Sequence, residues 1–275
     1  MRSCYDEAMR AAWLVLLAGC DAVLGLSKPV IADAARLDAP DALLGVHDPR
    51  CETPDEIAMD DAADEDGDGI ANRIDNCPGK FDKSQNDMDH DGIGDVCDPH
   101  RTVFGDEFVD VSYFNTELGC WVPDTPSNWT LGNGSVTTPN SVTAVLSLTP
   151  TATRGTLEVG FIATQTDSTS KIEVDLDYPG SIGFCFLSFD TSNTATLFAG
   201  DAFSSFSQNT NTMLGSTVHH LALTRDENGE TCNLDGSILP HPTPVTATTV
   251  TAKVTVTNAI VSLTYTVLYS APPPM

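Results

Sequence analysis

The sequence is poor in basic residues and contains no long apolar run. Its 275 residues include 13 Lys and Arg against 39 Asp and Glu, which gives a formal net charge of -26. A surface of this charge repels phosphate backbones, so the composition argues against DNA or RNA as a partner. Because no run of 18 apolar residues occurs, no segment is predicted to cross a membrane as a helix. The hydrophobic content of 41% is still sufficient for a folded core.

Several motifs of common enzymes and metal sites are also missing. The chain has no Gly-x-Ser-x-Gly, no His-Glu-x-x-His and no phosphate-binding loop. It has no Cys-x-x-Cys pair either, so a thiolate metal site is not expected. The eight cysteines therefore indicate disulfides and an oxidising compartment.

The amino-terminal residues carry an export signal. The apolar run 11–18 follows Arg10 and leads into Gly19-Cys20. Small residues before a cysteine let a peptidase reach the bond, after which Cys20 can carry acyl chains. The segment resembles the lipobox of bacterial lipoproteins, with an ordinary signal peptide or a buried apolar segment as the alternative. The resemblance implies a signal peptide at 1–19 and a cell-envelope protein whose acyl chains hold it on a membrane, at the outer membrane or cell surface in preference to the inner membrane.

Charge divides the rest of the chain into three regions. Residues 20–59 are rich in Ala, Asp and Pro and are interpreted as a spacer. Residues 60–98 contain thirteen acids and three bases. Residues 103–270 change character, because Thr, Ser, Asn and Gly dominate and short β-branched runs alternate with turn residues.

The acidic region contains one pattern twice, with an offset of 23 residues. Each copy has oxygen-bearing side chains at positions 1, 3, 5, 9 and 12, Gly at position 6 and Ile at position 7. Ca²⁺ binds six to eight oxygens, and such a loop supplies alternate side chains and the carbonyl of position 7, whereas Mg²⁺ demands tighter octahedral geometry. The pattern predicts two Ca²⁺ sites, with an acidic solvated linker as the alternative. The predicted ligands are Asp64, Asp66, Asp68, Ile70, Asn72 and Asp75 in the first loop and Asp87, Asp89, Asp91, Ile93, Asp95 and Asp98 in the second.

The residues around these loops resemble a known family. Asp75-Asn76-Cys77-Pro78, followed by Gln85 and the run 87–98, resembles the thrombospondin type 3 repeat over about residues 60–99. The resemblance implies an irregular, calcium-wrapped segment, which would form a stiff stalk, and a disulfide between Cys77 and Cys97. Asn72 departs from the family, where the first loop usually has Asp, and this removes a charge while keeping an oxygen.

Residues 103–270 predict an antiparallel jelly-roll β-sandwich, so the chain is expected to be mainly β. Strands are predicted where apolar and polar residues alternate or β-type residues cluster, at 141–148, 171–178, 183–189, 219–224, 250–256 and 259–269. Turn signals such as Pro179-Gly180 and Asp235-Gly236 separate them. The order of segments, with Asp106-Glu107-Phe108, Trp129 and 219–225, is similar to concanavalin A-like lectin and glucanase domains, including those of laminin-G type.

Three acids alternate along the predicted strand 171–178, namely Glu173, Asp175 and Asp177. Retaining glycosidases of the similar fold carry such a strand, whose outer members act as nucleophile and acid/base. The resemblance makes Glu173 and Asp177 the candidate catalytic pair, although the family pattern ends in Glu. The alternatives are the solvated face of a half-buried strand and an additional metal site.

Other side chains are weaker candidates. Trp121, Trp129 and Tyr178 are candidates for stacking on a sugar ring, with core packing as the alternative. His219 and His220 are adjacent in a predicted strand and face opposite ways, so they are not expected to serve one site.

Cysteine counting leaves three disulfides. Cys4 lies in the signal and Cys20 would be lipidated, so six cysteines remain. Besides the pair implied above, Cys185 lies in the predicted strand 183–189, and Cys232 lies in the β-type segment between the turn signals at 227–229 and 235–236, so they form the next expected pair. Cys51 and Cys120 then follow by exclusion.

Three functions fit these features. The first is a binding protein rather than an enzyme, in which a Ca²⁺-ordered segment displays a lectin-like module for a glycan or a surface protein. The second is a glycan hydrolase that uses Glu173 and Asp177. The third is a purely structural envelope spacer.

The lipobox interpretation predicts the behaviour of one variant. Cys20→Ser removes the acylated sulfur, and each acyl CH₂ buried in a bilayer contributes roughly 0.8 kcal/mol, so the variant should leave the membrane fraction. Sedimentation of membranes followed by immunoblotting measures this. A variant that still sediments quantitatively with membranes would show that Cys20 is not the anchor.

Overall fold

The computed structural model describes residues 64–114, 117–132, 134–148, 155–178, 181–190, 194–201, 205–213, 215–226, 229–241 and 251–270. All of them belong to one compact unit, Pro40–Met275. The predicted signal peptide, the lipidation site Cys20 and the spacer lie outside the described residues.

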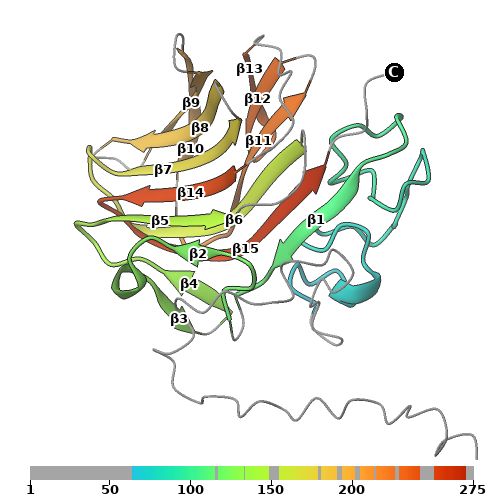
Figure 1. Cartoon of the computed structure of the whole chain (residues 1–275), viewed down its shortest axis with the longest axis horizontal. Coiled ribbons are helices and arrows are strands. Elements are labelled where there is room, and N and C mark those ends of the chain that lie inside the picture. Colours follow the sequence, from blue (N-terminus) through green and yellow to red (C-terminus); the bar gives the residue numbers. More distant parts are fainter. Residues whose placement is uncertain are drawn as a thin grey trace, which may run out of the picture. The chain divides into compact units, whose positions relative to one another are not determined.

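Two antiparallel sheets make up most of the described structure (Figure 1). The first, sheet A, has the order β13 (Ser237–His241), β12 (Gly229–Leu234), β11 (His219–Asp226), β6 (Gly155–Gln165), β15 (Ile260–Ser270), β4 (Ser135–Thr137) and β3 (Thr130–Gly132), and β1 (Glu107–Ser112) also pairs with β15. The second, sheet B, has the order β10 (Ser205–Met213), β9 (Thr194–Asp201), β8 (Ser181–Phe189), β7 (Lys171–Tyr178), β14 (Thr251–Thr257), β5 (Thr143–Leu148) and β2 (Val122–Pro123). Strands distant in sequence are neighbours, as where β14 lies between β5 and β7, and this confirms the predicted jelly-roll sandwich.

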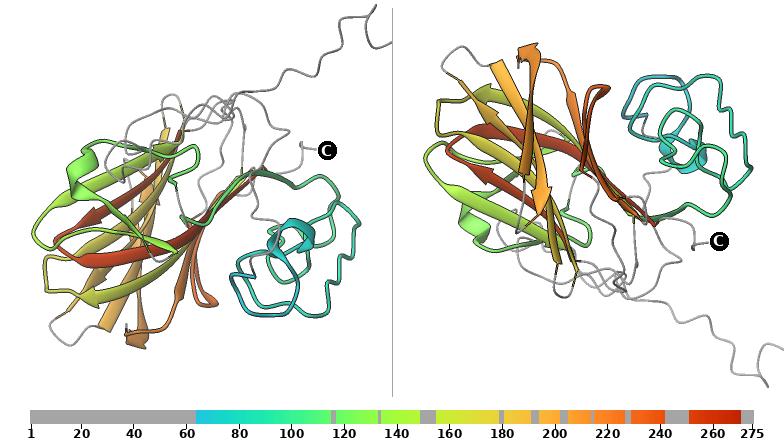
Figure 2. Two further views of the ribbon diagram at one scale, coloured as in Figure 1. Left: turned by 90° about the horizontal axis from the view of Figure 1, so that it is seen from below. Right: turned by 90° about the horizontal axis from the view of Figure 1, so that it is seen from above.

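Alternation of side chains explains the strands that the sequence predicts. In β7, Ile172, Val174 and Leu176 are completely buried, and the acids between them point to the other face of sheet B. The strand β14 repeats this arrangement with Ala252, Val254 and Val256. The core between the two sheets (Figure 2) is built from such inward rows. The disulfide Cys185–Cys232 crosses this core from β8 to β12, as predicted.

Several strands are absent from the prediction, among them the short strands β1 to β4 and β13 and the longer strands β6, β9 and β10. The strand β6 does alternate, because the polar residues Thr156 and Glu158 separate the core residues Leu157, Val159 and Phe161, so its period-two signal was overlooked. Thr156 and Glu158 are nevertheless buried, so both faces of this strand are covered. The strand β10 gives no pattern of alternating apolar residues, because its sequence Ser-Phe-Ser-Gln-Asn-Thr-Asn-Thr-Met is almost entirely polar.

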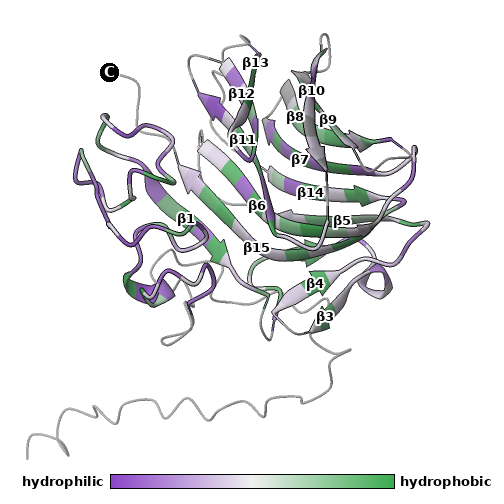
Figure 3. Cartoon of the chain, turned by 180° about the vertical axis from the view of Figure 1, so that it is seen from behind, coloured by the Kyte–Doolittle hydropathy of each residue, from purple (hydrophilic) through white to green (hydrophobic). Residues whose placement is uncertain are grey.

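The acidic repeats cover the outer side of sheet A. We call residues 64–106 the repeat segment; Figure 3 shows it as mostly hydrophilic and irregular. It shares a second apolar cluster with β1 and β15, which consists of Cys77, Ile93, Cys97, Val111, Tyr113, Tyr265, Val267 and Tyr269. The side chains of β15 exchange faces at a register shift between Leu263 and Tyr265. Tyr265 and Tyr269 therefore point away from the main core. The structure thus adds a docking contact that the sequence does not reveal.

Polar contacts fix the same docking. Lys80 Nζ lies 2.6 Å from Oε2 of Glu158, which is 2% exposed, and Tyr265 donates to the other carboxylate oxygen at 2.6 Å. Tyr113 donates its hydroxyl to the carbonyl of Pro78 at 3.1 Å. A Cβ added at Gly79 would come within 2.6 Å of the Tyr265 ring, so only glycine permits this close approach.

The helices found among the described residues are two short 3-10 turns, Asn72–Ile74 and Pro126–Asn128. Neither is long or apolar enough to cross a membrane.

Candidate metal centre and the acidic strand

The two predicted loops share one backbone geometry. In the first loop, the Asp64 carboxylate accepts from the amides of Gly67 and Gly69, both at 2.9 Å. In the second loop, the Asp87 carboxylate accepts from His90 at 2.7 Å and Gly92 at 3.0 Å. The chain therefore curls around the position 1 carboxylate in both copies. Gly at position 6 makes this possible, because Gly69 and Gly92 have φ of 96° and 101°.

Position 9 closes each loop. Asn72 Oδ1 accepts from the amide of Glu65 at 3.1 Å, and Asp95 Oδ1 accepts from the equivalent amide of Met88 at 2.9 Å. Only an acceptor oxygen is required for this bond. The side-chain amide of Asn72 therefore closes the first loop as the carboxylate of Asp95 closes the second.

Between these closures the carboxylates converge. Asp64, Asp66 and Asp68 place carboxylate oxygens within 4.8 Å of one another, and Asp87, Asp89 and Asp91 do the same. Position 7 behaves as expected in the second loop, where Ile93 is 1% exposed and packs in the cluster shared with sheet A. Ile70 is only partly buried.

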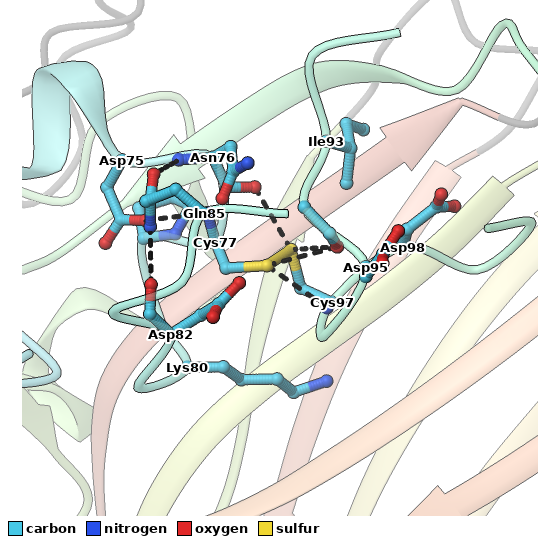
Figure 4. The surroundings of a disulfide bond; sticks show 12 residues. Asp75, Asn76, Cys77, Lys80, Asp82, Gln85, Ile93, Asp95, Cys97 and Asp98 are labelled. Carbon is cyan, nitrogen blue, oxygen red and sulfur yellow. Dashed lines mark hydrogen bonds between the residues drawn. A yellow bond between two sulfur atoms is a disulfide. The ribbon is translucent and has the colours of Figure 1, made fainter. Parts of the chain in front are cut away.

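A disulfide and a glutamine tie the two loops together (Figure 4). Cys77 and Cys97 are bonded, with Cα atoms 5.5 Å apart, as the family resemblance implies. Gln85 accepts from the Asn76 amide at 3.0 Å and donates to Asp75 Oδ1 at 2.8 Å. Cys120 is disulfide-bonded as well, but its predicted partner Cys51 lies outside the described residues.

The donor set fits a divalent cation. Several buried carboxylate oxygens of the repeat segment have no hydrogen-bond partner, namely Asp66 Oδ2, Asp75 Oδ2, Asp82 Oδ2, both oxygens of Asp89 and Asp98 Oδ2. A buried anionic oxygen without a partner is costly, typically by about 1–3 kcal/mol or more. Oxygen ligands in a flexible loop are those that Ca²⁺ takes. The residues predicted from sequence therefore suit this ion.

The electrostatics indicate the same deficit of positive charge. Burial raises the pKa of Asp66 to about 6; the amide of Asp68 opposes this rise, and the carboxylates of Asp75, Asp68 and Asp64 add to it. Burial likewise raises the pKa of Asp98 to about 7, with further raising by Asp106 and Asp91. A cation between these groups would favour the charged carboxylates and so oppose both the burial and the repulsion that raise the two pKa values.

A second set of polar groups lies on the outer face of sheet B. Lys171 pairs with Glu173, and Lys253 of β14 pairs with Asp177. On β8, Phe186 is opposite Glu173 and stacks on Phe198 of β9, with ring centroids 4.4 Å apart and planes at 7°. We call this set the aromatic–acidic face; it consists of Lys171, Glu173, Asp175, Asp177, Phe184, Phe186, Phe198 and Lys253.

Asp175 lies in the middle of this face and is only 9% exposed. Burial raises its pKa to about 8, and the carboxylates of Glu173 and Asp177 raise it further, against the opposing effect of Lys253 and Lys171. The acids of β7 are therefore more than a solvated strand surface, because the central one is almost buried between two other carboxylates.

The prediction that Trp121 and Trp129 stack on a sugar ring is wrong. Trp121 and Trp129 are each 2% exposed within the main core, so neither offers a ring to a ligand. Trp121 donates its indole N–H to buried Asp110 at 3.1 Å. The side chain of Tyr178, the third candidate, lies outside the described residues.

The adjacent histidines have separate environments, as expected. His219 Nδ1 lies 2.7 Å from Asp235 Oδ2 and its ring packs near Phe161 of the core. His220 Nδ1 lies 2.6 Å from the Tyr265 hydroxyl, on the side that the repeat segment covers.

The sequence interpretation missed Asp82, Asp106 and the phenylalanines of β8 and β9. The phenylalanines alternate with buried residues, since Phe184 and Phe186 flank Cys185, and this period-two signal was available. Asp82 and Asp106 lie outside the twelve-residue pattern, so no spacing rule identifies them.

Comparison with known proteins gives a fold likeness only. No family model and no curated protein matches the sequence. Among solved structures, a Bacillus licheniformis β-glucanase is 12% identical with a TM-score of 0.47, and covers 58% of this chain and 97% of its own. The laminarinase catalytic domain of Thermotoga maritima is 10% identical with a TM-score of 0.48, covering 61% and 99%. The carbohydrate-binding module CBM66 of Bacillus subtilis is 9% identical with a TM-score of 0.40, covering 53% and 94%. Values this low do not bear on substrate or activity.

The raised pKa of Asp175 predicts a pH-dependent difference in stability. The folded chain keeps this proton up to about pH 8, whereas the unfolded chain releases it near the ordinary aspartate pKa of 3.8. Stability therefore falls as pH rises between these values. Asp175→Asn should match the wild type near pH 4 and exceed its unfolding free energy at pH 8 by at least about 1.4 kcal/mol, the equivalent of one pKa unit.

Urea unfolding at both pH values, at one fixed Ca²⁺ concentration, measures this difference. Asp124→Asn, at an exposed position beside β2, is the matched control. A stability gain of Asp175→Asn that is the same at pH 4 and pH 8 would contradict the assignment.

Proposed function

We propose that this chain is a calcium-binding envelope protein whose repeat segment is ordered by Ca²⁺ and holds the outer side of sheet A. The supporting observation is the set of buried carboxylate oxygens without partners, gathered in two loops of the same geometry. The proposed ligands are those that the sequence predicts, namely the side-chain oxygens at positions 1, 3, 5, 9 and 12 and the carbonyl at position 7. When bound, the ion supplies a positive charge that lets these oxygens approach one another.

The contacts of the repeat segment explain why such order matters. Lys80 reaches the buried Glu158 only if the chain after the first loop is held in place. Ile93 and the Cys77–Cys97 pair pack on Tyr265 and Tyr269 in the shared cluster. Calcium binding is thereby coupled to the packing of β1 and β15 and not confined to a separate appendage.

We predict that removing one charge from either loop weakens Ca²⁺ binding. Asp66→Asn and Asp89→Asn keep side-chain size but delete a carboxylate whose oxygen is buried without a partner, so each should lower the affinity of one site at least tenfold. Isothermal titration calorimetry on the full-length chain measures this, with Asp124→Asn as the control of equal charge change. Unchanged affinity in both loop variants would refute the calcium assignment.

The second proposed function is glycan binding by the aromatic–acidic face. Sugar rings bind by stacking on aromatic rings and by donating hydrogen bonds from their hydroxyls to carboxylates, and this face carries aromatic rings and carboxylates within one surface, with Lys171 over the ring of Phe186. Its stacked pair, Phe186 and Phe198, lies beside Glu173 in the same row of the sheet. A glycosidase that uses Glu173 and Asp177 is the enzymatic version of this proposal. The ion pairs of Lys253 with Asp177 and of Lys171 with Glu173 favour binding, because each candidate catalytic carboxylate is already engaged by a lysine.

A pair of variants separates these possibilities. Phe186→Ala removes half of the stacked pair and should abolish binding on a glycan array, whereas Phe206→Ala, at an exposed ring on the edge strand β10, should not. Hydrolysis of laminarin- or xylan-type polymers that disappears in Glu173→Gln would establish an enzyme. If neither binding nor turnover is found, the sandwich is a structural spacer.

Two further parts of the proposal rest on the sequence. The repeat segment is proposed to be of thrombospondin type 3, on the Asp75–Pro78 motif and the run 87–98. Membrane attachment through acyl chains on Cys20 is proposed on the lipobox. Together they give an envelope-anchored chain with the aromatic–acidic face available to a ligand outside the membrane.

A further inference from the structure

The strand β10 is the edge of sheet B. It pairs with β9, and among the described strands none pairs with its other side. A strand at the edge of a sheet presents backbone N–H and C=O groups along its open side, and another chain can pair with them. We propose that β10 pairs antiparallel with β10 of a second copy of this chain, so that sheet B continues through both copies.

The other sheet edges of the described structure are protected, and β10 is not. The edge strands β2 and β3 have two and three residues, which is too few for an extended ladder. The strand β13 contains Pro240, which cannot donate a ladder hydrogen bond, and β1 carries the exposed Glu107. In contrast, β10 has nine residues with no proline and no charge. Natural sheet edges carry short strands, prolines or charges to prevent pairing, so the lack of all three indicates a pairing surface.

The charge of the chain favours this edge for self-association. Two copies repel one another, because each has a formal net charge of -26. Residues 202–224, which include β10, contain no Asp, Glu, Lys or Arg. The acidic repeats pack on β1 and β15 of sheet A instead. The β10 edge therefore lets two copies approach without bringing charged residues of the pairing strands together.

The side chains of β10 suit a strand from a second copy. Residues 205–208 are all exposed. Phe206 pairs with the completely buried Ala199 and so points to the core side, yet its ring, which contacts His241 of β13, is 50% exposed. An added strand would cover this ring. The hydroxyl and amide side chains of β10 both donate and accept hydrogen bonds, so the strand is complementary to itself across a two-fold axis.

This pairing would join two copies of the aromatic–acidic face. A row of paired residues crosses the outer face of sheet B from Glu173 through Phe186 and Phe198 to Ser207 of β10. Antiparallel pairing at β10 keeps the outer faces of both copies on one side of the continuous sheet. The two β9 strands would lie about 14 Å apart, three strand spacings of about 4.8 Å. One extended glycan would then contact both copies. This consequence rests on the proposed glycan binding, whereas the pairing itself does not.

The mass of the chain in solution tests the pairing. Sedimentation velocity is measured at a series of concentrations on the full-length chain with Cys20→Ser, in which acyl chains cannot cause association. We expect this parent chain to form a dimer. Ser207→Lys places like charges near the two-fold axis and should weaken the dimer by at least about tenfold. Thr130→Lys, the same charge change at an exposed position of the edge strand β3, should leave the dimer unchanged.

A mixture of two variants makes the test specific to this edge. Ser207→Lys and Ser207→Glu should each dimerise weakly alone and should form a heterodimer when mixed, because the charges near the axis are then opposite. A parent chain that is monomeric at every concentration overturns the inference. A dimer of equal affinity in Ser207→Lys, or a mixture that stays monomeric, overturns it as well. If Ser207→Lys lacks a folded near-ultraviolet circular dichroism spectrum, Ser205→Lys on the same face of β10 replaces it, with the same expected loss of affinity.

The outcomes also separate the pairing from the proposed glycan binding. A dimer that binds nothing on the glycan array supports the pairing and overturns the glycan function. A monomer that binds glycans overturns the pairing alone.

Discussion

Repulsion among buried carboxylates is the constraint on which the rest of this structure depends. The repeat segment brings Asp64, Asp66 and Asp68 within 4.8 Å and repeats this with Asp87, Asp89 and Asp91. Nothing in the surrounding backbone neutralises them, since the amides of each loop occupy only some of the oxygens. A divalent ion between the carboxylates would offset this repulsion. The Cys77–Cys97 disulfide and Gln85 hold the two loops in the geometry that brings the carboxylate oxygens together.

The same constraint reaches the sandwich. The strand β6 is buried on both faces because the repeat segment lies over it, and Glu158 on its outer side is satisfied by Lys80 and Tyr265. The irregularity in β15 turns Tyr265, Val267 and Tyr269 toward this segment. Sheet A thus has two apolar faces, one for the core of the sandwich and one for the repeats. Loss of order in the loops would expose the second.

Sheet B presents a different surface, for which we propose glycan binding. Its outer face combines stacked phenylalanines with three acids and two lysines, and the burial of Asp175 shows that these charges are arranged around one another. The two proposed functions therefore occupy opposite sheets. The Ca²⁺ sites proposed for the repeat segment beside sheet A would stabilise the protein, and the glycan site proposed on sheet B would bind a ligand.

Local chemistry was enough to identify much of this from the sequence. The two loops, the strands β5, β7 and β14 and the shared face of the β7 acids follow from spacing or period-two alternation, because each depends on residues close in the chain. The pair Cys185–Cys232, 47 residues apart, was expected only because both cysteines were placed in the sandwich. Only the tertiary structure decided the rest. Asp106 joins Asp98 across the end of a loop, Lys80 meets Glu158 from a distant strand, and Trp121 and Trp129 turn inward, since burial depends on which strands become neighbours. No periodicity in the sequence records which element covers another.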